Sequence, residues 1–289
     1  MNSQNKLVLI TGGSSGIGLS LARLYVQKGA NVWALARSAD KLKDALRLLK
    51  QNAVRPDQNI GVIQADVSKE EDIKSALKEF IDQQGTPDIV INSAGVVHPG
   101  RFETLESEKF RWMLNVNFLG TVYVLQAIIP QMVKRGSGTI INIGSGASFL
   151  GIYGYSAYSG SKYALRGFSD VLRAEMKPFG IQVSIVFPPD TETPQLDYEL
   201  KYKPAITKEI TGIVKPLSPD LVANRIIKGV ERGKYVIIPD FQTTMLYRLN
   251  NILGNFSYQV MDYLVSSAIR KHGLDKSKDQ REHSDLGNN

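Results

Sequence analysis

The chain has 289 residues, of which 43% are hydrophobic and 22% are charged, and its formal net charge at pH 7 is +7. It has no cysteine, which excludes disulfides, thiolate metal sites and a cysteine nucleophile, and its three histidines lack ligand spacing, so we expect no metal site. Its basic residues form no cluster interleaved with aromatic residues, so we expect no nucleic-acid partner. The net positive charge then indicates either attraction to anionic lipid or only solubility.

The N-terminal residues 1–6 are polar and run directly into an apolar segment, without the basic region, apolar core and cleavage site of a signal peptide. No stretch reaches the roughly 18 consecutive apolar residues that a membrane-spanning helix needs. We therefore expect a cytoplasmic protein, or one that works at the cytosolic face of a membrane.

A glycine-rich loop follows the first predicted strand, Leu7–Ile10, and precedes a helical pattern that starts at Leu19. The three glycines, at the spacing G-x-x-x-G-x-G, let the backbone turn sharply and approach a pyrophosphate, whose charge the helix N-terminus then favours. The loop therefore predicts a dinucleotide site formed by Gly12, Ser14, Ser15, Gly16, Ile17 and Gly18.

Predicted strands and helices alternate along the next two hundred or so residues. Further strands are expected at 31–36, 60–63, 88–91, 138–143, 182–186 and 234–238, and helices at 39–51, 69–84, 106–135 and 158–177. Strands that are apolar throughout predict a parallel sheet covered on both faces. We therefore expect a doubly wound, Rossmann-like α/β fold, with one catalytic domain over residues 1–240.

The end of the second predicted strand bears on the choice of dinucleotide. An acidic residue often lies about 20 residues beyond the glycine loop, where it binds the ribose 2′-hydroxyl. Arg37 and Ser38 stand there instead. Because a guanidinium can bind a 2′-phosphate through two parallel hydrogen bonds, we expect NADP(H) rather than NAD(H). The alternative is an ordinary surface arginine at a strand end.

Three side chains suit acid–base chemistry on a carbonyl group. Tyr158 and Lys162 are four residues apart on one helix face, where an ammonium favours the phenolate and lowers the pKa of the phenol. A surface helix pair is the plainer interpretation of this spacing. Ser145 follows the strand 138–143, at the sheet edge where ligands bind, and its hydroxyl can donate to a carbonyl oxygen.

Together these segments resemble the short-chain dehydrogenase/reductase family, over about residues 6–194. The motifs in the family's order and spacing are the glycine loop, Asp66-Val67, Asn92-Ser93-Ala94-Gly95, Asn117, Ser145, Tyr158 and Lys162. The resemblance implies that Tyr158 is the general acid, that Ser145 orients the carbonyl, and that Lys162 lowers the pKa of the tyrosine and holds the nicotinamide ribose. Asn117 would maintain a water-linked proton relay. Cofactor contacts are implied for Asp66 on the adenine side, for Asn92 on the ribose side, and for Val67, Ala94 and Gly95.

A narrower resemblance lies in the segment 187–194, Phe-Pro-Pro-Asp-Thr-Glu-Thr-Pro, which is similar to the Pro-Pro-Asp-Thr segment of the 3-ketodihydrosphingosine reductases. The approach to Tyr158 from residue 151 is also similar. The resemblance implies NADPH-dependent reduction of 3-ketosphinganine to sphinganine, with Pro188 and Thr191 contacting the cofactor. Asp190 or Glu192 is expected to meet the substrate ammonium; the alternative is a rigid loop set by its prolines.

Two other functions are compatible with the sequence. One is a reductase of the same fold for another apolar ketone, such as a 3-oxoacyl thioester or a steroid, because loops outside the core determine specificity. The other is a nucleotide-binding scaffold without turnover, against which the complete set of acid–base residues argues.

The remaining residues predict a flap and a helical extension. Residues 195–217 are expected to cover the substrate, before a helix that starts near Ser218. Residues 241–271 have apolar residues at helical spacing, with a break at Gly254. Their apolar face is expected either at a bilayer surface or packed against the domain or a second subunit of a dimer or tetramer. Residues 272–289 are polar enough to form a disordered tail.

Overall fold

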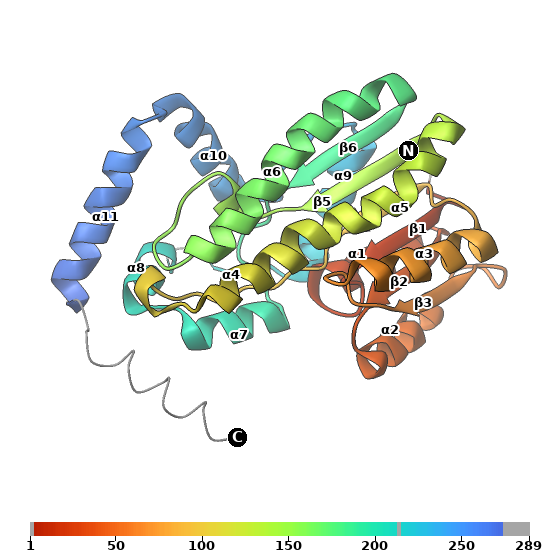
Figure 1. The fold of residues 1–289 in the computed structure, drawn as a ribbon, viewed down its shortest axis with the longest axis horizontal. Helices are drawn as coiled ribbons and strands as arrows, with labels where there is room; N and C mark the ends of the chain where they lie inside the picture. Colours follow the sequence, from red (N-terminus) through yellow and green to blue (C-terminus); the bar gives the residue numbers. More distant parts are fainter. Residues whose placement is uncertain (1–2, 213–214, 274–289) are drawn as a thin grey trace.

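The structure is a computed structural model that describes residues 3–212 and 215–273 (Figure 1). A parallel seven-stranded sheet, in the order β3-β2-β1-β4-β5-β6-β7, runs through its centre. Its strands are β1 (Leu7–Thr11), β2 (Asn31–Ala36), β3 (Ile60–Gln64), β4 (Ile89–Asn92), β5 (Gly138–Ile143), β6 (Ile181–Val186) and β7 (Val236–Ile237). The order reverses between β1 and β4, and a ligand crevice is expected at such a point.

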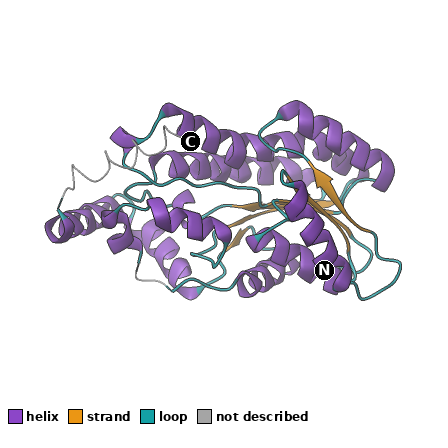
Figure 2. Ribbon diagram, turned by 90° about the horizontal axis from the view of Figure 1, so that it is seen from below, coloured by secondary structure: helices purple, strands orange, loops and turns teal. Residues whose placement is uncertain are grey.

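Helices cover both faces of the sheet, as Figure 2 shows. One face packs against α1 (Gly16–Gln27), α2 (Ala39–Gln51) and α9 (Pro219–Glu231). The other packs against α3 (Glu70–Gln84), α5 (Gly120–Arg135) and α6 (Ser156–Met176). The strands are buried from both sides, which explains why their sequences are mainly apolar rather than alternating. The polar residues Thr139, Asn142 and Ser184 within β5 and β6 are themselves buried. The predicted doubly wound fold is confirmed.

The helix predicted at 106–135 has an irregular centre. It consists of α4 (Ser107–Leu114), a π-helical turn at Asn115–Leu119 and α5. By length and composition Ser107–Arg135 could cross a membrane. However, Val124, Ile128 and Met132 are fully buried against the sheet, so this is a core helix of the fold.

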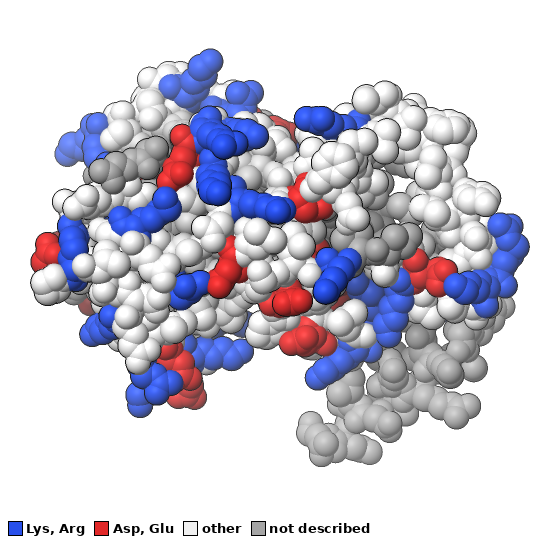
Figure 3. Space-filling view, turned by 180° about the vertical axis from the view of Figure 1, so that it is seen from behind, with Lys and Arg blue, Asp and Glu red and all other residues white. Residues whose placement is uncertain are grey.

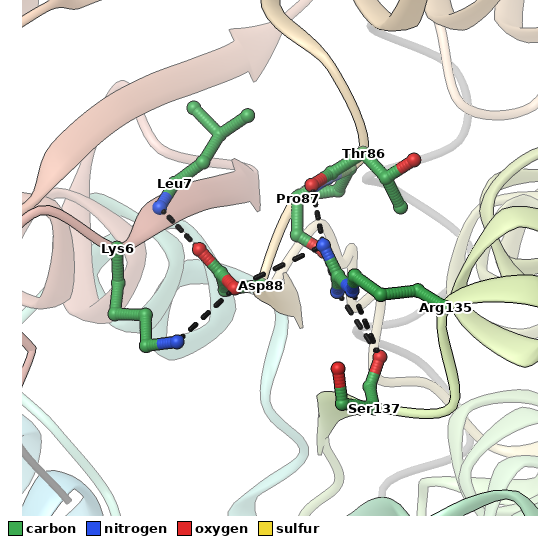
Figure 4. Close-up of polar contacts among 7 residues, drawn as sticks. All are labelled: Lys6, Leu7, Thr86, Pro87, Asp88, Arg135 and Ser137. Carbon is green, nitrogen blue, oxygen red and sulfur yellow. Dashed lines mark hydrogen bonds and ion pairs between the residues drawn. The ribbon is translucent and has the colours of Figure 1, made fainter.

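The edge of the sheet opposite the carboxyl ends of the strands is held by a polar junction around Asp88 (Figure 4). The Asp88 carboxylate accepts hydrogen bonds from the Leu7 amide at 2.9 Å and from Lys6 Nζ at 3.3 Å, and it lies 3.8 Å from the Arg135 guanidinium. Arg135 also donates to three backbone carbonyls, those of Thr86, Pro87 and Ser137. The junction thus connects the starts of β1, β4 and β5.

The region beyond β6 is mostly helical. The expected flap contains α7 (Pro194–Tyr202) and α8 (Ala205–Thr211), two short helices that its weak periodicity did not predict. The expected extension forms α10 (Phe241–Leu253) and α11 (Phe256–His272), and the chain turns at Gly254, whose φ is +52°. The expected tail from 272 lies outside the described residues after Gly273.

The pair α10 and α11, here called the C-terminal hairpin, contacts the rest of the molecule through both of its helices. In α10, Asn250 Nδ2 donates to the Phe149 carbonyl at 3.0 Å, and the Tyr247 ring lies 5.1 Å from the Phe149 ring. The second helix packs against α8. The hairpin is therefore attached to the flap and to the segment that follows β5 (Figure 1).

Candidate active site

A cavity of about 620 Å³ opens at the carboxyl ends of the strands. The glycine loop and the segments after β4, β5 and β6 form one part of its wall, and α7, α8 and the C-terminal hairpin form another. The cavity has the size of a ligand-binding pocket. It brings together the predicted site residues Gly12, Ser15, Gly16, Ile17, Gly18, Gly95, Ser145, Tyr158, Lys162, Pro188 and Thr191.

The glycine loop fits a dinucleotide pyrophosphate. Gly12 has a φ of +66°, and a Cβ there would lie 2.8 Å from the Ala94 backbone, while a Cβ on Gly18 would lie 2.3 Å from the Gly12 carbonyl oxygen. Only glycine allows this close packing. The first turn of α1 lines the cavity. The N-cap residue Ser15 makes no side-chain hydrogen bond to this turn, and within α1 the first turn contains no acidic residue. The partial positive charge of the helix N-terminus is thus available to an anion.

Tyr158 and Ser145 both lie in the wall of the cavity, where the Ser145 hydroxyl is close enough to the phenol to influence its pKa. Tyr158 lies in the first turn of α6, and Ser145 follows β5, where its hydroxyl also accepts from the Ala147 amide at 3.2 Å. Burial raises the pKa of Tyr158; the Ser145 hydroxyl opposes this, and the charges of Glu199 and Asp190 add to it. The phenol therefore holds its proton at neutral pH, which is the state that a general acid needs.

Lys162 lies one helical turn beyond Tyr158 and is 5% exposed. Its Nζ donates to the Ile143 carbonyl at 2.9 Å and lies 5.8 Å from the centre of the Tyr158 ring. Burial lowers the pKa of Lys162 to about 8. Desolvation favours the uncharged form of both side chains, so the pKa of Tyr158 is raised, whereas we expected Lys162 to lower it.

Asn117 is fully buried in the π-helical turn. Its Oδ1 accepts from the Val96 amide at 2.7 Å, and its Nδ2 donates to the Val96 carbonyl and to Ser161 Oγ, each at 2.9 Å. A Cβ on Gly95 would lie 3.5 Å from Asn117 Oδ1 and 3.6 Å from Lys162 Nζ, so both side chains reach the same glycine. Asn117 therefore holds the segment after β4 beside Lys162.

Arg37 and Ser38 follow β2, the strand next to β1, and Asp66 follows β3 on the other side of β2. Arg37 Nη1 lies 4.0 Å from Asp66 Oδ2, and the Arg37 side chain is 57% exposed. The Ser38 hydroxyl caps α2 by accepting from the Lys41 amide at 3.4 Å. Although they are not among the described lining residues of the cavity, the three residues lie together, as an extended dinucleotide requires.

The other predicted residues have packing roles in the structure. Asn92 is buried, and its Nδ2 donates to Asn142 Oδ1 at 2.9 Å, while its own Oδ1 has no hydrogen-bond partner in the described part of the chain. Val67 belongs to the core cluster, and the Ala94 amide donates to Thr11 Oγ1 at 3.2 Å. These residues and Ser14 do not line the cavity over the ranges that the structure covers.

The two acidic residues of the loop after β6 that we considered for substrate binding have different environments. Asp190 lines the cavity, whereas Glu192 is exposed and is not a described lining residue. Thr191 is buried in the cavity wall, where its hydroxyl donates to the Pro189 carbonyl at 2.8 Å.

Sequence reasoning missed several residues of the cavity. Ser93 lies in a motif that we quoted, but we did not assign it a role. Tyr155, Glu199 and Lys203 form a polar cluster, and we had no local motif for them because two of them come from the flap. Apolar side chains from the same flap, from the segment after β5 and from the C-terminal hairpin complete the wall: Leu150, Ile152, Leu196, Ile210, Leu246, Met261 and Leu264.

Comparison with known proteins gives a consistent result. A sequence model of the family described as short chain dehydrogenase matches residues 6–202. The 3-ketodihydrosphingosine reductase of Bos taurus is 36% identical over 229 residues, which are 79% of this chain and 69% of the relative. The 3-ketodihydrosphingosine reductase of Dictyostelium discoideum is 32% identical over 285 residues, which are 94% of this chain and 85% of the relative.

Solved structures share the fold. A short-chain dehydrogenase from Sphingobium yanoikuyae in complex with NADPH superposes with a TM-score of 0.74 at 25% identity, covering 89% of this chain and 95% of that one. The motifs and the fold therefore have one explanation: the chain belongs to the short-chain dehydrogenase family.

Proposed function

We propose that the protein is an NADPH-dependent reductase that converts the 3-keto group of 3-ketosphinganine into the hydroxyl group of sphinganine. The observation that carries this proposal is the pair Tyr158 and Ser145 in a cavity with a dinucleotide-binding loop in one part of its wall and apolar side chains in another. The names of the relatives support the substrate class, and the NADPH held by the Sphingobium neighbour supports the cofactor.

Each residue near Tyr158 has its own role in the proposed reaction. NADPH, when bound, supplies the hydride that adds to the ketone carbon. Tyr158 donates its proton to the ketone oxygen, and Ser145 donates a hydrogen bond to the same atom. Lys162, fixed by the Ile143 carbonyl, holds the nicotinamide ribose, and Asn117 keeps the path for proton resupply in place beside it.

The remaining cofactor contacts extend away from the tyrosine. The glycine loop binds the pyrophosphate, with Thr191 and Pro188 on the nicotinamide side. Arg37 and Ser38 bind the 2′-phosphate, and Asp66 contacts the adenine. Asn92, Val67, Ala94 and Gly95 shape the ribose side through the packing of β4 and of the segment after β3.

The C-terminal hairpin is the part of the protein that we expect to meet lipid. It has some of the most exposed large apolar side chains of the described chain, among them Phe241 at 75% and Ile252 at 79% exposure. Figure 3 shows that the surface over the hairpin, at the upper right of that view, has few charged residues. Leu246, Met261 and Leu264 of the same hairpin line the cavity. A bilayer contact at the cytosolic face of a membrane would bring a lipid ketone to this entrance.

The test is NADPH oxidation by the purified protein with 3-ketosphinganine, an acetoacetyl thioester and a steroid ketone. We expect turnover with the sphingoid ketone, and a loss of kcat by about 10²- to 10⁴-fold in Tyr158→Phe, with NADPH binding unchanged. Activity on only one of the other ketones would refute the substrate, and unchanged turnover in Tyr158→Phe would refute the role of the tyrosine.

A further inference from the structure

Four polar side chains meet in the cavity wall near Tyr158. Glu199 belongs to α7, Lys203 follows this helix, Asp190 lies in the loop after β6, and Tyr155 precedes α6. Lys203 Nζ lies 2.8 Å from Glu199 Oε1 and 3.9 Å from Asp190 Oδ2, and the Tyr155 hydroxyl donates to Glu199 Oε1. The Lys203 and Glu199 side chains are only 3% and 12% exposed.

This cluster has an excess of negative charge, because two carboxylates share one ammonium. The other charged side chain among the described lining residues is that of Lys162, which is bonded to the Ile143 carbonyl. Lys203 approaches one oxygen of each carboxylate, Oε1 of Glu199 and Oδ2 of Asp190. The Asp190 side chain lines the cavity and is 40% exposed. Glu199 is paired with Lys203 and largely buried, whereas Asp190 remains accessible from the cavity and lies farther from the ammonium. The net negative charge of the cluster therefore attracts a second cation in the cavity.

The position of the cluster matches the position of a cation in the proposed substrate. The Tyr155 and Tyr158 rings have centroids 5.9 Å apart, which places the cluster next to the proton donor. The charges of Glu199 and Asp190 also raise the pKa of Tyr158, as expected of carboxylates close to the phenol. In 3-ketosphinganine the carbon with the ammonium group is bonded to the ketone carbon. When the ketone oxygen meets Tyr158, the ammonium group must therefore lie beside it.

We propose that Asp190 and Glu199 form the subsite that binds the ammonium group of the substrate, with Lys203 and Tyr155 as positioning residues that hold Glu199. This inference rests on the proposed function. A ketone without an amine leaves the cluster with its uncompensated charge, so the subsite discriminates against it. The exposed Glu192 of the same loop takes no part.

The test compares kcat/KM for 3-ketosphinganine and for 1-hydroxyoctadecan-3-one, which has the same chain and ketone but no amine. We expect Glu199→Gln and Asp190→Asn each to lower kcat/KM for the amine substrate by about 10- to 100-fold, mainly through KM. The same variants should change kcat/KM for the amine-free ketone by less than about threefold. The matched control is Glu192→Gln, for which we expect both values to stay as in the wild type.

Equal losses of kcat/KM with both substrates would show that the cluster only supports the fold, and would overturn the subsite. Unchanged kcat/KM with the amine substrate would overturn it as well. Asp190→Asn keeps the test decisive if Glu199→Gln fails to fold, because Asp190 lies farther from Lys203 than Glu199 does; a titration with NADPH checks folding. A wild-type protein equally active on both ketones would overturn the subsite alone. A wild-type protein inactive on both would refute the proposed function itself.

Discussion

Arg37 is the residue whose side chain we expect to select the cofactor. Its guanidinium is more than half exposed at the end of β2, close to Asp66 but free to turn toward a phosphate. We expect Arg37→Gln to lower the ratio of kcat/KM for NADPH to that for NADH by about 10- to 100-fold, because a hydrogen bond to a charged group contributes about 1.5–3 kcal/mol. The measurement is initial rates with each nucleotide.

The control for this prediction is Lys41→Gln, which removes a nearby cation that lies in the first turn of α2. We expect it to leave the nucleotide preference within about twofold, since a lysine that makes no phosphate contact has only a screened, long-range effect. A preference that is unchanged in Arg37→Gln would show that the 2′-phosphate is recognised elsewhere.

The residues that the sequence could identify are those with short local motifs. Tyr158 and Lys162 are one turn apart on a helix, and Ser145 follows a strand, so local spacing makes them candidates. Their roles came from the resemblance of the combined motifs to the short-chain dehydrogenase/reductase family. Glu199 and Asp190 could not be paired in this way, because they converge only when α7 folds back beside the loop after β6. The pKa of Tyr158 was also beyond reach, since its direction depends on burial in the folded protein.

At the scale of elements, the C-terminal hairpin carries a prediction about membranes. We expect Ile252→Glu together with Phe256→Glu to weaken binding to anionic vesicles by at least about tenfold, because each buried apolar side chain contributes about 1.5–3 kcal/mol. Activity on substrate in detergent should persist. Cosedimentation with vesicles is the measurement.

The matched control is Val54→Glu, which places the same charge on an exposed apolar residue outside the hairpin, 58% exposed. Its vesicle binding should equal that of the wild type. If the double variant binds vesicles normally but changes molar mass in light scattering, the hairpin is a subunit interface of a dimer or tetramer instead.

Most elements were predictable because each strand is mainly apolar and each long helix has an apolar stripe. The predicted 182–186 and the observed Ile181–Val186 show how closely such runs mark strands. The π-helical turn around Asn117 was not predictable, because it changes the backbone hydrogen bonding without a change in the apolar pattern. The helices α7 and α8 are too short for a clear period.

At the scale of the whole molecule, the candidate active site and the polar junction around Asp88 lie at opposite ends of the strands. The junction around Asp88 and Arg135 connects three strands at the edge away from the cavity. We expect Arg135→Ala to lower the free energy of unfolding by about 1–3 kcal/mol through the lost hydrogen bonds. The kcat should not change. Urea unfolding and steady-state rates measure the two effects.

An exposed arginine provides the comparison. Arg47 is 74% exposed and pairs with Asp44 on the surface of α2, so Arg47→Ala should change the free energy of unfolding by no more than about 0.5 kcal/mol. Equal stability of the Arg135→Ala and Arg47→Ala variants would mean that water replaces the hydrogen bonds of the junction without loss.

The wall of the cavity restricts how the protein can be shortened. Leu246, Met261 and Leu264 come from the last helices, although all the residues assigned to hydride and proton transfer precede residue 200. A chain cut after residue 240 would keep every side chain that we propose for catalysis and the glycine loop, yet the cavity would lose Leu246, Met261 and Leu264 from its wall. Removal of the exposed apolar helices would therefore also remove the apolar surface that we expect to cover the alkyl chain of the substrate.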